Sequence, residues 1–313
     1  MNLKIQKPAV VCALSLLCCA LWGSAFPCIK LGYEWLNIEG TGSQILFAGY
    51  RFFLSGIFTF IIGCVVEKRI LTMKRSSVWH IFRQGILQTT VQYVCFYIGL
   101  AYTTGTKGSI INASQGFVAI IAAHFMLKNE KMNVQKTLGC ILGFAGVVAV
   151  NLAPGAWGSG FSLKGEGMVL LCTVVYGISM VLLKMIADEE SSMTITAYQT
   201  LMGGALLILI GFAMGGRVEG FTLQSVLLLI YMALLSTTAF SIWTILMKYN
   251  PVGKVAVYTF TIPVFAAALS GLILGEDVFE VKNLIALVLV SAGIIIVNRP
   301  DKVMAPDSTC DIP

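Results

Sequence analysis

Long apolar runs alternate with short polar segments along almost the whole chain. Each run has about 20 residues, the length that a helix needs to cross the hydrocarbon core of a bilayer. A backbone in lipid must form its hydrogen bonds internally, so each run is predicted to be an α-helix. The runs are too long and too uniformly apolar for β-barrel strands. Ten spans are predicted, at residues 9–30, 46–66, 82–103, 108–127, 134–152, 165–187, 193–215, 222–245, 254–274 and 280–298.

The composition places the function inside the membrane. Of the 313 residues, 57% are hydrophobic and only 12% are charged, with a mean hydropathy of +0.86. A soluble domain carries roughly 25% charged residues. This composition excludes a soluble enzyme, a disordered protein and a nucleic-acid-binding protein, and it leaves no extramembrane domain. The net charge of +6 is dispersed at the ends of the apolar runs, so the bilayer is the partner that it indicates.

Motifs for enzymatic chemistry and cofactor binding are missing from the sequence. The nine cysteines are odd in number, lie mostly within apolar runs and form no CxxC pair, which argues against disulfides and zinc. There is no Gly-rich phosphate loop, no HExxH and no GxSxG. We therefore expect no catalytic residue, no metal and no cofactor, and neither an ATP-driven pump nor a hydrolase.

Basic residues indicate the orientation in the membrane. With the N-terminus in the cytoplasm, the cytoplasmic segments include the basic stretches 67–81 and 128–136, whereas the external segment 153–164 has one lysine. This asymmetry follows the positive-inside rule, and it places both termini in the cytoplasm. The first apolar run continues past the length of a signal peptide, so we interpret it as an uncleaved helix. The tail ends without a retention signal for the endoplasmic reticulum, which favours the plasma membrane or a bacterial inner membrane.

An internal repeat is the most informative feature of the chain. Trp22-Gly23 recurs as Tyr176-Gly177 at a shift of 154 residues, and the stretch 146–151 recurs as 293–298 at a shift of 147. Glu130 similarly recurs as Glu276. These matches predict two five-span repeats, at residues 9–152 and 165–298. Because five is odd, the second copy is expected to be inverted in the membrane, an arrangement typical of secondary transporters.

The motifs of the repeat resemble those of EamA-type exporters in the drug/metabolite transporter superfamily. They are Trp22-Gly23-Ser24 with Lys30, Arg51-Phe52, Gly99-Leu100-Ala101-Tyr102-Thr103, Glu130, and Pro263 with Leu274-Gly275-Glu276. The resemblance covers about residues 9–298. It implies an all-α protein whose helices 1–4 and 6–9 surround a central cavity, with helices 5 and 10 packed peripherally. The first half departs from the pattern, with Asn129 where glycine is usual before the glutamate and Gly116 or Phe117 where the second half has Pro263.

A few charged or helix-kinking residues could serve in transport. Lys30 and Arg51, which we place near the outer ends of the first two spans, could attract an anionic substrate group, or could simply extend toward the interface. His124 could carry a proton, or could be a neutral packing residue. Pro263 could form a gating kink, or could only shape its helix. Every Asp and Glu lies at a span end or in a loop, so no carboxylate is available for proton coupling in mid-membrane.

Polar and aromatic side chains within the spans are the candidates for lining a substrate cavity. Buried amides need partners and should face inward, and aromatic faces can hold apolar or cationic groups. The same residue types also form interfacial belts and lock helices together. The candidates are Trp22, Gln92, Tyr93, Gln115, Tyr176, Gln199 and Tyr258.

These observations favour a secondary transporter that exports a small metabolite, such as an amino acid, by alternating access. Two alternatives stay open. A phosphate- or nucleotide-sugar antiporter would need several cavity-facing cations, whereas the sequence provides only Lys30 and Arg51 as candidates. A non-transporting membrane enzyme or sensor would need a cluster of catalytic or ligand-binding residues. Gly139-x-x-x-Gly143 in the fifth span could also mediate a homodimer.

Overall fold

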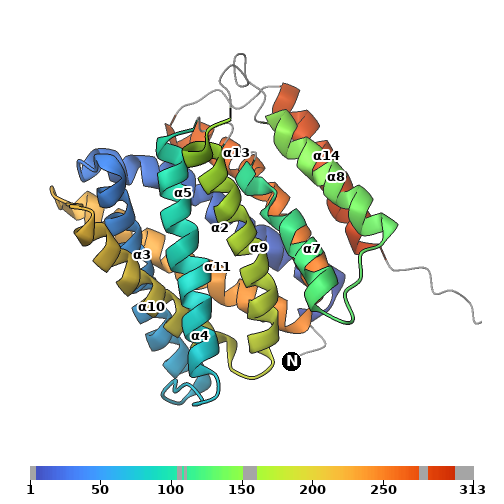
Figure 1. Ribbon diagram of the computed structural model, residues 1–313, viewed down its shortest axis with the longest axis horizontal. Coiled ribbons are helices and arrows are strands. Elements are labelled where there is room, and N and C mark those ends of the chain that lie inside the picture. The colour runs from blue at the N-terminus through green and yellow to red at the C-terminus, as the bar shows by residue number, and fades with distance from the viewer. Residues whose placement is uncertain (1–4, 104–107, 109–110, 151–160, 275–280, 300–313) are drawn as a thin grey trace, which may run out of the picture.

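The computed structural model describes residues 5–103, 108, 111–150, 161–274 and 281–299 (Figure 1). Within these ranges the chain is helical and contains no β-strand. The elements are α2 (Pro8–Trp35), α3 (Gly40–Glu67), α4 (Val78–Gly85), the π-helix η1 (Ile86–Val91), α5 (Gln92–Ala101), α7 (Gln115–Met126), α8 (Val134–Val150), the π-helix η2 (Leu163–Gly167), α9 (Met168–Ala187), α10 (Ser192–Ala213), α11 (Leu223–Tyr249), α12 (Val252–Ala256), the 3-10 helix η3 (Val257–Thr261), α13 (Ile262–Leu274) and α14 (Val281–Asn298).

Several of these helices have the dimensions of membrane spans. In the described part of the chain, six helical stretches are long and apolar enough to cross a bilayer, and three shorter apolar helices accompany them. The predicted third span is present as α4, η1 and α5 in succession. The all-α class and the membrane-spanning character expected from the sequence are therefore confirmed.

The first connection is shorter than predicted. The expected loop 31–45 is wrong, because α2 continues to Trp35 and α3 already begins at Gly40. In the sequence, the charges of Lys30 and Glu34 suggest a loop, but both residues lie on an exposed face of α2, which continues past them. The turn itself is made by Asn37 and Gly40, whose φ angles are +48° and +76°.

Glycines allow α3 and α10 to pack closely side by side (Figure 1). Glycines recur every seven residues in α3, or about two helical turns, and successive ones contact progressively earlier positions of α10 and its C-terminal end. Gly42, Gly49, Gly56 and Gly63 lie near Met214, Ile208, Leu201 and Met193, respectively. A Cβ on Gly49 would lie 2.7 Å from Ile208 N, and one on Gly56 would lie 2.6 Å from Leu201 N. The two helices are therefore antiparallel, and the absence of side chains lets their backbones approach.

The helices α8 and α14 form a second antiparallel pair along one flank of the bundle (Figure 1). Gly139 contacts Val297 and Gly293, while Gly143 lies beside Gly293 and Phe260. The small-residue motif of the fifth span is thus occupied within the chain. A homodimer, which stays a prediction, would need another surface.

Two further contacts hold the interior helices together. Gly23 of α2 lies against α13, where an added Cβ would be 2.6 Å from Phe265 Cβ. Gly177 of α9 lies against α7, where an added Cβ would be 2.6 Å from Val118 Cγ1. Both glycines allow a close helix crossing that any larger residue would obstruct.

The connecting segments gather at two ends of the bundle. At one end, which we call the basic end, the 68–77 segment contacts the 188–191 turn, and Glu130 contacts the start of α12. At the opposite end, Thr103 Oγ1 donates to Glu166 at 2.9 Å, and the N–H of Arg217 donates to Ser43 Oγ at 3.0 Å. The segments at the basic end are among those for which the sequence predicts a cytoplasmic location.

Candidate functional site

A continuous aromatic cluster lies in the buried core of the bundle. Trp22 contacts Trp243 and Phe240 at ring-centroid distances of 4.9 and 5.5 Å. Phe240 is 6.0 Å from Phe52, which lies 4.5 Å from Tyr93. The rings are tilted or edge-on, the geometry that aromatic pairs prefer. We define the aromatic cluster as Trp22, Phe52, Tyr93, Tyr97, Phe240 and Trp243.

Helical spacing places these rings toward one another. Phe240 and Trp243 are three residues apart on α11, and Tyr93 and Tyr97 are four apart on α5, so each pair shares a helix face. Trp22 is next to Gly23, whose close contact with α13 holds this part of α2 deep in the bundle. The sequence predicted Trp22 and Tyr93 here. It missed Phe240 and Trp243, which are ordinary apolar residues in a long apolar run.

Arg51 is buried beside this cluster rather than at the outer mouth. It is the twelfth of 28 residues in α3 and is 3% exposed, whereas the Lys30 side chain is exposed. Its Nε donates to Ser236 Oγ at 2.8 Å, and its Cζ lies 5.1 Å from the centroid of the Phe52 ring. The expected outer position is wrong because α3 begins six residues earlier than predicted, which puts Arg51 nearly halfway along the helix.

Four buried amides lie on the third span and on α10, which pack together where Gly85 contacts Gln199. Gln84 Nε2 donates to Gln88 Oε1 at 2.6 Å and to the carbonyl of Ser179 at 3.0 Å. Within the described residues, Gln92 Oε1 and both polar atoms of the Gln199 amide have no hydrogen-bond partner. An unpaired buried amide costs about 1–3 kcal/mol, so these atoms are suited to a bound ligand or water. We define the amide group as Gln84, Gln88, Gln92 and Gln199.

The sequence indicated only half of the amide group. Gln92 and Gln199 were predicted, and Gln84 and Gln88 were missed although the spacing of four residues was visible. The π-helix η1 lies between Gln84 and Gln92, and such segments are frequent at functional sites.

Tyr176 joins the aromatic cluster to the amide group. It is 4% exposed and lies within interaction range of Gln88, Tyr93 and Cys19. Tyr258 is also buried, and its carbonyl accepts from Cys19 Sγ at 3.2 Å, so it lies against α2. Gln115 is buried at the start of α7, beside the contact of Gly116 with Thr259.

His124 lies in the last turn of α7, and Pro263 lies at the start of α13. The Nδ1 atom of His124 accepts the N–H of Met132 at 3.0 Å. Pro263 is the second residue of α13, directly after the 3-10 helix η3. Because proline has no N–H, it interrupts the α-helical bonding and accounts for this local change of helix type.

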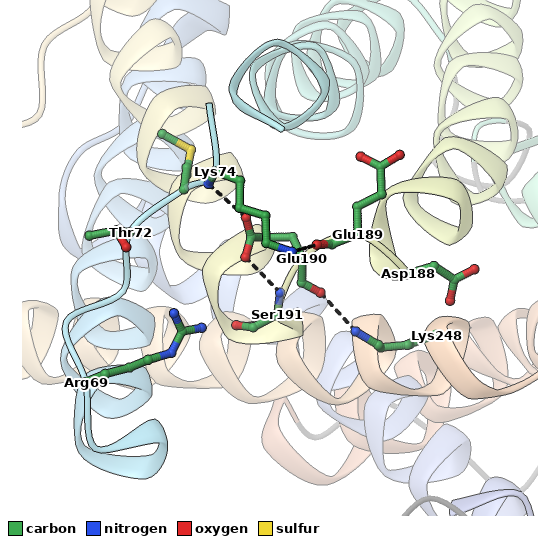
Figure 2. A pocket seen from close by; sticks show the side chains of 9 residues that line it. Arg69, Thr72, Lys74, Asp188, Glu189, Glu190, Ser191 and Lys248 are labelled. Carbon is green, nitrogen blue, oxygen red and sulfur yellow. Dashed lines mark hydrogen bonds between the residues drawn. The ribbon is translucent and has the colours of Figure 1, made fainter. Parts of the chain in front are cut away.

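A polar cavity of about 410 Å³ opens at the basic end (Figure 2). The buried Glu190 carboxylate accepts backbone N–H groups from Lys74 at 3.0 Å and Ser191 at 3.2 Å. Lys248 Nζ donates to the Glu190 carbonyl at 3.0 Å. These bonds connect α11 and two connecting segments. The cavity is lined by Arg69, Thr72, Met73, Lys74, Asp188, Glu189, Glu190, Ser191 and Lys248.

No group of three or more His, Cys, Asp or Glu residues that could hold a metal ion occurs in the part of the chain described. The arrangement offers aromatic faces, amides and one buried cation. These groups can bind a small molecule, but they do not constitute a catalytic constellation.

Long apolar helices around such an interior are typical of a polytopic membrane protein. The chain belongs to the EamA-like transporter family, whose model matches residues 9–152 and 163–299. The resemblance seen in the sequence is therefore confirmed, and the protein is a multi-pass membrane transporter.

Similar proteins share this description. The uncharacterized transporter YetK of Bacillus subtilis (strain 168) is 25% identical over 258 residues, which are 80% of this chain and 77% of YetK. An uncharacterized transporter of Archaeoglobus fulgidus is 28% identical over 277 residues, covering 87% of this chain and 90% of that protein. A solved structure titled "Crystal structure of protein" matches 93% of this chain and 96% of its own with a TM-score of 0.78. At 17% identity, it shows a shared fold.

Proposed function

We propose that the protein is a secondary transporter that exports a small metabolite, such as an amino acid, across the plasma membrane. In this proposal the repeats 9–152 and 165–298 are inverted relative to each other, and they alternate between outward-open and inward-open arrangements around the aromatic cluster. Both termini lie in the cytoplasm.

The observation that carries this proposal is a pair of exchanged helix contacts. Gly23 lies against Phe265 and Ala266, and Gly177 lies against Val118 and Ala119. The repeat shift of 154 converts position 23 into 177, and the shift of 147 converts 118 and 119 into 265 and 266. Each half thus supplies the partner for the other half's tryptophan-glycine or tyrosine-glycine helix, as two copies related by a pseudo-two-fold axis require.

The antiparallel pairs support the same arrangement. The helices α3 and α10 occupy the second position of each predicted repeat, and α8 and α14 occupy the fifth. Counterpart helices that meet at a pseudo-two-fold axis in the membrane plane run in opposite directions. Both pairs do so. The two ranges matched by the family model also correspond closely to the two predicted repeats.

The interior supports a small amphipathic substrate. Aromatic faces bind apolar groups, and unpaired amides bind polar ones, so the site suits a molecule with both. Arg51 is the one lysine or arginine among the described residues that is buried. A phosphate- or nucleotide-sugar would call for more cations, and a membrane enzyme would call for a catalytic cluster.

Transport by the purified protein in liposomes tests the proposal. Efflux of radiolabelled amino acids and other small metabolites should saturate with concentration, and the double change Trp22→Ala and Tyr176→Ala should abolish it. The control is Trp79→Ala, because Trp79 is an exposed aromatic residue of α4. If no member of a broad metabolite panel gives saturable flux, the proposed function is wrong.

A further inference from the structure

We propose that Arg51 is the anion-binding residue of the transport site and that it holds a carboxylate group of the substrate. This inference rests on the proposed function and extends it to a chemical class of substrate, small monocarboxylates with an apolar body. It goes beyond the predicted Lys30 and Arg51 pair, because the two side chains lie in different environments.

Burial of the Arg51 guanidinium is the first observation. The residue is 3% exposed in the middle of a membrane-spanning helix, where a cation without a counter-charge is costly. Arginine stays protonated under all physiological conditions, so the charge cannot be relieved by deprotonation. Within the described ranges Arg51 takes no part in an ion pair, unlike Arg69 with Glu67 and His80 with Glu189. An anion from outside the protein would supply the missing counter-charge.

Ser236 orients the guanidinium for this task. Its hydroxyl accepts from Arg51 Nε and donates to the Met232 carbonyl at 3.0 Å, so it is fixed on α11. Ser236 is the fourteenth of 27 residues in α11, and both partners therefore lie about halfway along their helices. Because Nε donates to Ser236, the two terminal nitrogens of the guanidinium are the ones that would contact a ligand. Carboxylates bind this planar group through paired hydrogen bonds.

The aromatic cluster extends from the arginine in one direction. Ser236, Phe240 and Trp243 follow one another on one face of α11, and they span about 10 Å at 1.5 Å per residue. Phe52 connects Arg51 to the middle of this stretch, since its ring lies near both Arg51 and Phe240. Among the described residues, the indole N–H groups of Trp22 and Trp243 have no acceptor. The site thus has a cation at one end, apolar faces along its length and hydrogen-bond donors at the other.

Charge matching favours a carboxylate over a phosphate ester. One buried cation neutralises one negative charge, and a buried ion pair is tolerable when the charges balance and the hydrogen bonds are satisfied. A phosphate monoester carries between one and two negative charges at neutral pH, so part of its charge would be left unpaired. Neutral carboxamides and esters carry no negative charge, so they cannot form an ion pair with this cation.

The test compares acids with their own carboxamides on the purified protein. Thermal stabilisation in detergent is measured for simple 2-hydroxy acids and other small monocarboxylates with an apolar body, each against its neutral carboxamide, with inorganic phosphate and glucose 6-phosphate as further probes. We expect at least one acid to stabilise the wild type at a concentration about tenfold lower than its amide does. Arg51→Gln should remove this preference. Lys164→Gln removes an exposed positive charge at the end of the bundle opposite the basic end, and it should retain the preference for the acid.

The outcomes are distinguishable. A merely structural role for Arg51 would lower the affinity for acid and amide alike, so the acid-to-amide ratio is the decisive measurement. If Arg51→Gln does not fold, Arg51→Lys keeps the charge and should keep the preference with weaker binding, because lysine has no planar fork. Equal binding of acids and amides by the wild type, binding of phosphates in their place, or no binding of any acid would overturn the inference. Acid-selective binding without flux in liposomes would contradict the proposed function and leave the Arg51 site standing.

Discussion

The Glu190 carboxylate accepts the backbone N–H of Lys74 at 3.0 Å, although the two residues are 116 positions apart in the chain. This bond joins the segment after α3 to the turn between α9 and α10, and so it connects the first half of the protein to the second at the basic end (Figure 2). An anion that is buried with two backbone donors stabilises the contact between these two segments.

Removal of this carboxylate should loosen the basic end. Glu190→Ala deletes two charge-assisted hydrogen bonds and should cost about 1.5–3 kcal/mol in the free energy of unfolding. A cysteine placed at Thr72 in the cavity wall should also react faster with a water-soluble maleimide. The control is Glu189→Ala, since the exposed Glu189 side chain makes only a 3.7 Å contact with His80. Similar losses in both variants would contradict this role of Glu190.

Glu130 should stabilise the start of α12 in a comparable way. Its two oxygens accept the N–H groups of Val252 at 2.9 Å and Gly253 at 3.2 Å, where the helix leaves donors unpaired. Glu130→Gln keeps one acceptor and removes the charge, so we expect a loss of about 0.5–2 kcal/mol in thermal unfolding experiments. Glu219→Gln, at an exposed loop position, should leave the stability unchanged. An equal effect at the two positions would argue against the capping role.

The exchanged glycine contacts predict matched effects in the two halves. Gly23→Ala and Gly177→Ala each introduce a methyl group within 2.6 Å of the opposing helix, and each should cost about 1–3 kcal/mol through overpacking. Gly253→Ala is the control, because its nearest neighbour is the flexible Lys136 side chain at 3.4 Å. Unfolding temperatures and efflux rates should fall together in the first two variants. A large effect in only one half would count against the pseudo-symmetry.

Trp22 should contribute more than packing to transport. Trp22→Phe keeps an aromatic ring in the cluster but removes the unpaired indole N–H. We expect efflux to fall several-fold, with a loss of stability smaller than the about 3–5 kcal/mol of Trp22→Ala. Trp79→Phe, whose side chain is exposed, should change neither quantity. If Trp22→Phe transports like the wild type, its N–H does not contact the substrate.

The sequence predicted the features that depend on helix-length hydrophobicity. Runs of apolar residues located the spans, and polar residues within them located Trp22, Tyr93, Tyr176 and Gln199 in the interior. Charges near the ends of a run do not reveal whether the helix stops or continues with an exposed face. For this reason Lys30 suggested an end that lies at Trp35, and Arg51 was placed too near the surface.

The remaining site features depend on tertiary packing. Phe240 and Trp243 are indistinguishable in the sequence from lipid-facing apolar residues, and only the crossing of α2 and α11 brings them against Trp22. The π-helix η1 has no sequence signature, yet it separates Gln84 from Gln92. The amide spacing itself was visible, so Gln84 and Gln88 were within reach of the sequence.

The opposed orientation of the two halves is the central claim, and the sidedness of two counterpart loops tests it most directly. Arg69 follows α3, and Arg217 follows α10, the corresponding helix of the second repeat. Reporter fusions or single cysteines labelled with an impermeant maleimide would report the side of each position in intact cells. The account predicts Arg69 in the cytoplasm and Arg217 outside. Both positions on one side of the membrane would contradict it.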